Sequence, residues 1–344
     1  MKKEKLIQPY QMKVDLALSR IYQEIDKRFF FVDVRPEFKN KRIEIKGFVH
    51  FQQIKNAVLK AFTEIFDEWN VSVGSLNVLQ VKDSPTFSQI NVHCATVYRQ
   101  PSPKAPIETQ EVFGRYIRTY LESGGWIFAQ GIDGYIGWID KSFLVEKNPD
   151  DYLRWLNGLR CRFKTSQKVK GFEFPIGAEF AYDNKKGILL PNGIYLKVSR
   201  EHLAIINPAK NRKRFELIKT AQKLLGKKYL WGGKTEVGID CSGFVQLIYE
   251  LNGISLPRDA NQQVNVGYRI GHFSDCRDLL PGDIVFFMNN DAKIFHVGMS
   301  LGGKKFIHSS SKPGVTLSAL INDEKAECNK RYCENYVMAR RILV

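Results

Sequence analysis

Residues 229–244 read YLWGGKTEVGIDCSGF and place one cysteine, Cys241, between an aspartate and Ser-Gly-Phe. The apolar residues that follow fall on one face of a helix that ends near Gly253: Phe244, Val245, Ile248 and Leu251. Cys241 is therefore expected in a first helical turn, where backbone N–H groups are unpaired and the dipole is positive. Both effects favour a thiolate of depressed pKa, which makes Cys241 a candidate nucleophile, although a cysteine at a helix start also fits a structural role.

Two histidines on expected strands are candidates for the base that such a thiol needs. His296 lies in FHVGMS and His308 in FIHSSS, and Gly302-Gly303 signals a hairpin between them. A turn centred on Gly302 places the two histidines opposite each other on one face of the sheet, whereas a plain two-residue loop turns His308 away. We therefore predict an odd-length loop or a bulge. His272, in a Gly-flanked loop, is the alternative base.

The motifs YLWGG and DCSGF, then LPRDANQQ, PGDIVFF and FHVGMSLGGKKFIHSSS, resemble those of the NlpC/p60 papain-like cysteine peptidases. The resemblance covers roughly residues 210–342 and implies a papain-like α+β fold. It implies that Cys241 is the nucleophile, that His296 is the base and that His308 orients the base. Tyr229 matches a tyrosine whose hydroxyl helps to polarise the scissile carbonyl, and the Cys241 N–H is its partner in an oxyanion hole. The resemblance implies no metal and no organic cofactor.

The wider layout resembles the γ-D-glutamyl-L-diamino acid endopeptidases, in which bacterial SH3-like domains precede the catalytic domain. Those enzymes cut peptidoglycan stem peptides between D-Glu and the diamino acid, and they recognise the free amine of the N-terminal L-Ala. Asp240 and Ser242 match the residues that bind this amine, and a carboxylate and a hydroxyl do suit an ammonium. Trp231 matches an aromatic wall of the same subsite, and its alternative is a core tryptophan beside two glycines.

The first SH3-like barrel is expected to contribute to the same pocket. Tyr135, in DGYIGW, matches a pocket tyrosine of those relatives. A carboxylate of this barrel, Glu108 or Glu111, is expected to help hold the amine. Arg258 of LPRDANQQ is expected to shape the loop after the nucleophile helix and has no assigned chemical role.

The sequence divides into four expected regions. Residues 1–85 have an αββαβ order that resembles a BON-like domain in pattern only. Residues 86–150 contain short strands separated by Pro and Gly, which predicts an SH3-like β-barrel, and residues 151–208 resemble a second, degenerate copy. Residues 209–344 predict the catalytic domain, with a helix FELIKTAQKLLG that ends at Gly226, the nucleophile helix, and strands DIVFFM, FHVGMSL, KFIHSSS and YVMARRIL.

The composition limits the partners and the compartment. The net charge of +16 favours acidic partners such as wall polymer, but the charges are dispersed and no nucleic-acid fold signature is present, so a solvated basic surface fits as well. No apolar run reaches the ~20 residues of a membrane-spanning helix. The start MKKEKLIQPYQMKVD is basic but lacks an apolar segment, which predicts a cytoplasmic protein if this terminus is native, and a periplasmic or extracellular one if a signal peptide was removed.

The six cysteines contain no CxxC pair, which argues against a zinc site. We expect Cys94, Cys161 and Cys276 to fill core positions. Cys328 and Cys333 could form a local disulfide in an oxidising compartment, but two reduced thiols are expected.

These features together predict a cysteine endopeptidase that acts on murein peptides or peptidoglycan at the γ-D-glutamyl–diamino acid bond. The diamino acid, diaminopimelate or lysine, and the oligomeric state stay open, as does the choice between wall remodelling and murein recycling. One alternative is an NlpC-like amidase or acyltransferase that acts on another amide. A second is a non-catalytic cell-wall-binding module in which the thiol is idle.

Overall fold

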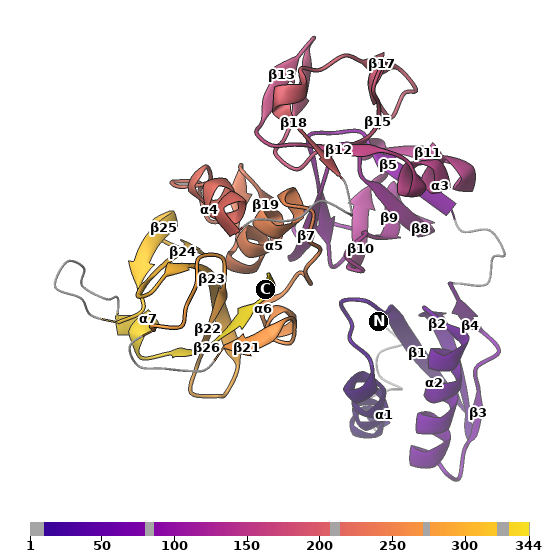
Figure 1. Cartoon of the computed structure of the whole chain (residues 1–344). Coiled ribbons are helices and arrows are strands. Elements are labelled where there is room, and N and C mark those ends of the chain that lie inside the picture. The colour runs from indigo at the N-terminus through magenta and orange to yellow at the C-terminus, as the bar shows by residue number, and fades with distance from the viewer. Residues whose placement is uncertain (1–9, 80–85, 207–213, 271–275, 322–329, 344) are drawn as a thin grey trace.

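The computed structural model describes residues 10–79, 86–206, 214–270, 276–321 and 330–343. Four groups of elements follow one another along the chain (Figure 1). In the described ranges, no helix is both long and apolar enough to cross a membrane.

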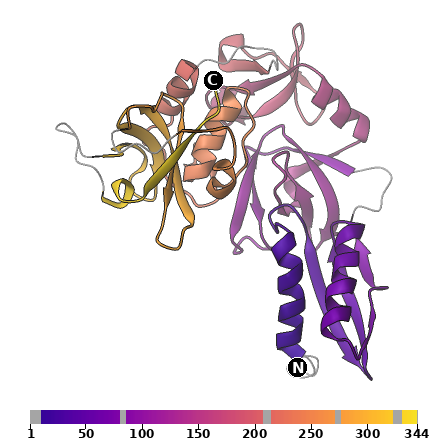
Figure 2. The ribbon, with the colours of Figure 1, turned by 60° about the horizontal axis from the view of Figure 1, so that its bottom comes forward.

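The N-terminal unit is a four-stranded sheet with two helices. Its elements are α1 (Gln11–Glu24), β1 (Val32–Lys39), β2 (Arg42–Val49), α2 (Gln52–Ile65), β3 (Asn70–Ser72) and β4 (Leu76–Val78). The β1–β2 hairpin turns at Asn40 and Lys41, which both have positive φ, as a tight hairpin requires. The single closing strand expected here is two short strands, and both pair in parallel with β2. Figure 2 shows this unit beside the first barrel.

The first barrel is a seven-stranded sheet in the order β11-β5-β8-β9-β10-β6-β7. Its elements are β5 (Thr86–Ile90), β6 (Cys94–Tyr98), β7 (Ile107–Val112), β8 (Tyr116–Ser123), β9 (Trp126–Gln130), β10 (Ile136–Asp140), the 3₁₀ helix η3 (Lys141–Phe143) and β11 (Leu144–Lys147). The sequence patterns did not predict β7, because its four central residues, 108–111, are all polar and leave no apolar alternation. This edge strand contacts β19 (Lys234–Thr235), which lies close before α5 in the chain.

A helix that the sequence patterns did not reveal, α3 (Pro149–Asn157), connects the two barrels. The Asn148 side chain accepts from the Asp151 N–H at 2.8 Å, and Pro149 occupies the first turn, both common at helix starts. The second barrel contains β12 (Arg160–Phe163), β13 (Gln167–Val169), β14 (Phe172–Phe174), β15 (Glu179–Asp183), β16 (Gly187–Leu189), β17 (Tyr195–Leu196), η4 (Arg200–His202) and β18 (Leu203–Ile206). Five of these strands form one sheet, and β13 and β14 form a separate hairpin.

The catalytic domain has a six-stranded antiparallel sheet, β21-β26-β22-β23-β24-β25. Its elements are α4 (Arg214–Gln222), β19 (Lys234–Thr235), β20 (Gly238–Ile239), α5 (Cys241–Leu251), α6 (Ala260–Gln263), β21 (Tyr268–Ile270), β22 (Ile284–Met288), β23 (Ile294–Gly302), β24 (Lys305–Ser310), β25 (Gly314–Ala319), α7 (Lys330–Cys333) and β26 (Tyr336–Arg341). The four expected strands are present, whereas β21 and β25 were not predicted. The α4 helix ends at Gln222, four residues before the expected Gly226.

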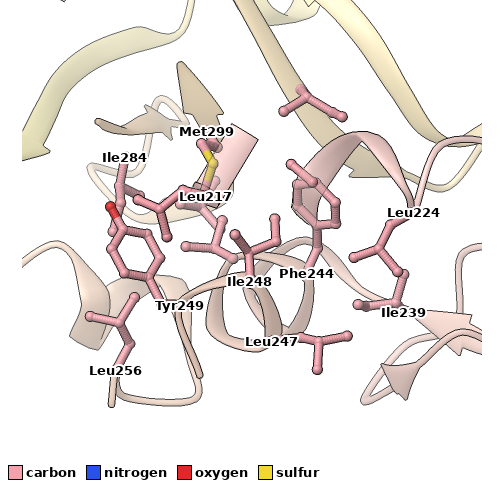
Figure 3. Packing of buried hydrophobic residues seen from close by; sticks show 14 of the residues in the cluster. Leu217, Leu224, Ile239, Phe244, Leu247, Ile248, Tyr249, Leu256, Ile284 and Met299 are labelled. Carbon is pink, nitrogen blue, oxygen red and sulfur yellow. The ribbon is translucent and has the colours of Figure 1, made fainter. Parts of the chain in front are cut away.

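The α5 helix is buried on all sides. Every residue from Ser242 to Glu250 is buried, as is typical of a helix in the centre of a fold. Figure 3 shows Phe244 and Ile248 of α5 in the apolar core that also contains Leu217 of α4 and Met299 of β23. Such close packing holds the first turn of α5 in one position relative to β23 and β24.

Buried polar contacts connect both barrels to α5. Arg115 of the first barrel donates from Nη2 to Glu250 Oε2 at 2.6 Å, and Lys234 Nζ lies 3.1 Å from Glu250 Oε1. In the second barrel, Arg162 donates from Nη1 to the Glu250 carbonyl of α5 and from Nε to Glu179 at 2.7 Å. Removing one partner of such a buried pair costs several kcal/mol, so these contacts fix the barrels against the catalytic domain.

Candidate active site

Cys241 is the first residue of α5, as the sequence predicted. Asp240 is the N-cap: its Oδ1 accepts from the Gly243 N–H at 2.6 Å. The Cys241 sulfur accepts from the backbone N–H of Val297, the residue after His296, and α5 packs against β23. The thiol and the His296 imidazole therefore belong to one site.

The expected low pKa of Cys241 is wrong. Burial raises the pKa of this thiol to about 12, and the negative charge of Asp240 adds to the increase. The N–H of Val297 and the charge of Arg258 lower the pKa of the thiol, but their effect is smaller than that of burial. Cys241 is thus a neutral thiol at rest, and its attack requires a base that takes the proton.

His296 and His308 form a hydrogen-bonded pair on neighbouring strands. His296 Nε2 lies 2.7 Å from His308 Nδ1, and His308 Nε2 lies 2.9 Å from Ser318 Oγ of β25. His296 is 6% exposed and His308 is fully buried. Because Nε2 of His296 is engaged, Nδ1 is the nitrogen left to serve the thiol.

The predicted bulge is present, but the predicted direct opposition of the histidines is wrong. The ladder between β23 and β24 shifts between Ser300 and Gly302, and Met299 pairs with Ile307. In this register Gly298 faces His308, and His296 lies two residues further along the same face. A Cβ added at Gly298 would lie 3.0 Å from the His308 Cβ, so the glycine provides the space in which the His308 ring leans toward His296.

Both imidazoles are neutral near neutral pH. Burial lowers the pKa of His308 to about 4. The pKa of His296 is lowered well below its usual value by burial, then by His308 and Arg331. Tyr332 of α7 covers the pair, with its ring centroid 5.0 Å from that of His296 and 4.7 Å from that of His308. A neutral His296 can accept the Cys241 proton.

Tyr229 lies close enough to Cys241 to be affected by its charge. Burial, followed by the charges of Cys241 and Asp240, raises the pKa of Tyr229 above its usual value. The hydroxyl therefore stays protonated and can donate a hydrogen bond. This is the property that the expected oxyanion role requires.

Arg258, to which the sequence assigned no chemical role, forms a buried bidentate ion pair with Asp240. Its Nη2 lies 2.6 Å from Asp240 Oδ2, its Nη1 lies 3.0 Å from Oδ1, and Nη1 also donates to Ser242 Oγ at 2.9 Å. Asp240 further accepts from Gly232 N–H at 2.9 Å. The two residues expected to hold an ammonium thus already belong to a hydrogen-bond network, and only the motif LPRDANQQ pointed to Arg258.

The other expected subsite residues differ in exposure. Trp231 is 73% exposed, so the alternative of a core tryptophan is wrong. Tyr135 is 1% exposed, and burial and the neighbouring Asp259 raise its pKa. Glu108 pairs with Arg99, whereas Glu111 is fully buried beside Arg115. The sequence could not separate the two glutamates, because only the barrel fold decides which one is buried.

The remaining histidine and cysteine predictions have mixed outcomes. His272 and Cys328 lie outside the described residues. Cys161 and Cys276 are buried core residues, and Cys94 is partly buried. Cys333 is disulfide-bonded, so the expectation of a reduced thiol at this position is wrong. Ser318 and Tyr332 were missed because β25 and α7 were not predicted.

Residues 226–339 match the NlpC/P60 family, and residues 97–144 match the bacterial dipeptidyl-peptidase Sh3 domain. A gamma-D-glutamyl-L-lysine dipeptidyl-peptidase of Bacillus subtilis is 30% identical over 254 residues, which are 66% of this chain and 81% of the relative. A probable endopeptidase NlpC homolog of Haemophilus influenzae is 39% identical over 120 residues, 35% of this chain and 57% of the relative.

An NlpC/P60 family protein of Bacillus cereus, solved as a crystal structure, superposes with a TM-score of 0.64 at 22% identity, covering 75% of this chain and all of that one. This similarity shows that the two proteins share a fold over most of the chain. Membership of the family rests on the sequence relatives, of which the Bacillus subtilis protein is 30% identical. The chain therefore belongs to the NlpC/P60 family and is a cysteine peptidase.

Proposed function

We propose that the protein hydrolyses the γ-D-glutamyl–diamino acid bond of peptidoglycan stem peptides that carry a free N-terminal L-Ala. The observation that carries this proposal is the position of the hydrogen-bonded pair His296–His308 beside a partly buried thiol at a helix start. Two relatives named gamma-D-glutamyl-L-lysine dipeptidyl-peptidase support the bond, at 30% and 27% identity. A relative named murein DD-endopeptidase MepS/murein LD-carboxypeptidase, 37% identical over 119 residues, supports murein as the substrate class.

Acylation begins with transfer of the Cys241 proton to Nδ1 of His296. The thiolate then attacks the carbonyl carbon of the γ-glutamyl amide and forms a C–S bond. The Cys241 N–H and the Tyr229 hydroxyl donate to the resulting oxyanion. Collapse of this intermediate breaks the C–N bond, and His296 gives its proton to the leaving amine of the diamino acid.

Deacylation reverses these proton movements. Neutral His296 takes a proton from water, and the hydroxide attacks the thioester carbonyl. The C–S bond breaks, the γ-D-glutamyl carboxylic acid leaves, and His296 returns the proton to the Cys241 sulfur. His308 acts through His296: its hydrogen bond fixes the ring orientation, and Ser318 in turn fixes His308.

Asp240 and Ser242 would receive the substrate ammonium at the entrance of this site. Arg258 neutralises part of the Asp240 charge, so the amine has to share the carboxylate with the guanidinium. Asp240 and Ser242 are both buried, so bulk water has little access to them. A buried polar group without a hydrogen-bond partner is unfavourable, which favours contact with the ammonium. The exposed ring of Trp231 would form an apolar wall for the L-Ala methyl group.

The test is hydrolysis of L-Ala-γ-D-Glu-diaminopimelate and L-Ala-γ-D-Glu-L-Lys by the native protein and by Cys241→Ala. We expect the native protein to release the diamino acid and Cys241→Ala to lose this activity. The matched control is Cys276→Ala, which removes a buried thiol elsewhere in the domain and should remain active. Equal hydrolysis by the native protein and Cys241→Ala, or hydrolysis of neither peptide by the native protein, would overturn the proposal.

A further inference from the structure

Residues 26–31, between α1 and β1, lie between the first barrel and α6. They precede residues 97–144 and 226–339, the two ranges that match known families. On the barrel side, the Arg28 carbonyl accepts from the Ile136 N–H at 2.9 Å. On the catalytic side, the Arg28 Nη1 donates to Asp259 Oδ2 at 2.6 Å and to Asn261 Oδ1 at 2.8 Å. One residue of the N-terminal unit therefore contacts both walls of the proposed pocket.

The barrel contact involves the motif that contains Tyr135. The Phe29 ring packs edge-on against Tyr135, with centroids 5.3 Å apart and ring planes at 80°. A Cβ on Gly134 would lie 2.9 Å from Phe29 Cδ1, so the glycine of this motif permits the approach. The rings of Phe31 and Phe128 also pack together, with centroids 4.3 Å apart, and add to the contact between this segment and the first barrel. Tyr135 is therefore held in place by a segment outside its own barrel.

The catalytic contact involves the loop that carries Arg258. Asp259 is the N-cap of α6, where a capping box with Gln262 fixes its conformation. Its neighbour Arg258 holds Asp240, the residue before Cys241. A displacement of Asp259 would therefore change the position of the proposed amine subsite relative to the nucleophile.

Asp26 orients the Arg28 side chain toward Asp259 and Asn261. The Arg28 Nε donates to Asp26 Oδ1 at 2.9 Å and Nη2 donates to Oδ2 at 2.6 Å, which leaves Nη1 for Asp259 and Asn261. A planar guanidinium can serve the three partners at once, whereas a lysine ammonium cannot reproduce this fork. The Arg28 guanidinium is only partly exposed, so solvent screens the contact less than a surface ion pair.

We propose that the N-terminal unit determines substrate selection, through Arg28 as a positioning residue that holds Tyr135 of the barrel at a fixed distance from the Asp259 loop of the catalytic domain. This inference rests on the proposed function, because it assumes that the substrate amine binds between these walls. Loss of Arg28 leaves the thiol and the histidine pair in place but widens the pocket at its amine end. The affinity for a peptide with a free N-terminus then falls, whereas the rate of the chemical step changes little.

The experiment compares kcat and KM of the full-length protein and its variants on L-Ala-γ-D-Glu-L-Lys and on the N-acetylated peptide. For Arg28→Ala we expect KM for the free-amine peptide to rise about fivefold or more, kcat to stay within about twofold, and the preference for the free amine to fall. The KM of Arg28→Lys should lie between those of the native protein and Arg28→Ala. Asn261→Ala should also raise KM, but by less than Arg28→Ala does. Arg20→Ala is the matched control, because Arg20 pairs with Glu64 on the surface of the same unit.

Thermal unfolding by circular dichroism verifies that each variant is folded. If Arg28→Ala does not fold, Asn261→Ala decides alone, because Asn261 is exposed and its truncation removes one partner of Nη1. An unchanged KM and an unchanged preference in the folded variants would overturn the inference, and so would a loss confined to kcat. Failure of the native protein to cleave either peptide would instead overturn the proposed function.

Discussion

His296 and His308 share a hydrogen bond of 2.7 Å although they do not pair with each other in the sheet. The bulge between Ser300 and Gly302 offsets the two strands, and the missing side chain at Gly298 leaves room for the His308 ring to span the offset. The geometry of the histidine pair therefore depends on backbone features as well as on the two imidazoles.

Ser318→Ala is expected to lower kcat about threefold to tenfold with little change in KM. The hydroxyl contacts His308 Nε2 at 2.9 Å and contributes only by orienting that ring. Because Ser318 acts through His308, the double variant with His308→Ala should be no slower than His308→Ala alone. Steady-state kinetics on the stem tripeptide measure this, with the exposed Ser199→Ala as the control. Additive losses in the double variant would show that Ser318 has another role.

Gly298→Ala is expected to lower kcat by at least about tenfold, because its Cβ would lie 2.8 Å from Phe306 Cδ2 and 3.0 Å from the His308 Cβ. The clash should move His308 away from His296 without touching the substrate subsite, so KM should change little. Gly74→Ala is the control, since its Cβ would find its nearest neighbour at 3.6 Å. Full activity of a folded Gly298→Ala protein would contradict this account of the glycine.

Arg258→Met is expected to lower the free energy of unfolding by about 3–5 kcal/mol, because it leaves the buried Asp240 carboxylate without its cation. Urea unfolding followed by fluorescence measures the change. In the control Arg99→Met, which removes one partner of an exposed ion pair with Glu108, the loss should stay below about 1 kcal/mol. Similar losses in the two variants would mean that burial does not distinguish these pairs.

Glu111→Gln is expected to stabilise the protein increasingly as the pH rises from 5 to 8. Burial, then the charge of Asp133, raises the pKa of Glu111 to about 7, although Arg115 and Lys234 oppose this. The folded protein thus holds a proton that the unfolded chain has already lost above about pH 4.5, and the resulting stabilisation disappears as the pH passes 7. Glutamine stays neutral throughout.

The difference in unfolding free energy between Glu111→Gln and the native protein isolates this effect from that of the buried histidines. By linkage it should grow by on the order of 3 kcal/mol across that range. Urea titrations at pH 5, 6, 7 and 8 provide the measurement. A difference that does not vary with pH would show that Glu111 stays ionised in the folded protein.

The helix that begins at Cys241 could be predicted because its signals are local. Asp240 caps it, its apolar residues recur at helical spacing, and Gly253 has the positive φ of a helix end. The bulge in the histidine hairpin was predictable for the same reason, since only a limited set of loops brings His296 and His308 to one face. Strands β7 and β25 were missed because short strands with mixed polar residues carry a weak periodic signal.

By itself, the sequence selected Cys241 as the candidate nucleophile and His296 and His308 as the candidate base and its orienting residue, and it predicted α5 and the strands that carry the two histidines. Only the tertiary structure decided that burial raises the pKa of Cys241, that Arg258 pairs with Asp240, and that Arg28 contacts Asp259, 231 residues away in the chain. The physical reason is that desolvation and ion pairing depend on which distant segments exclude water from a group, and no local pattern of residues contains that information.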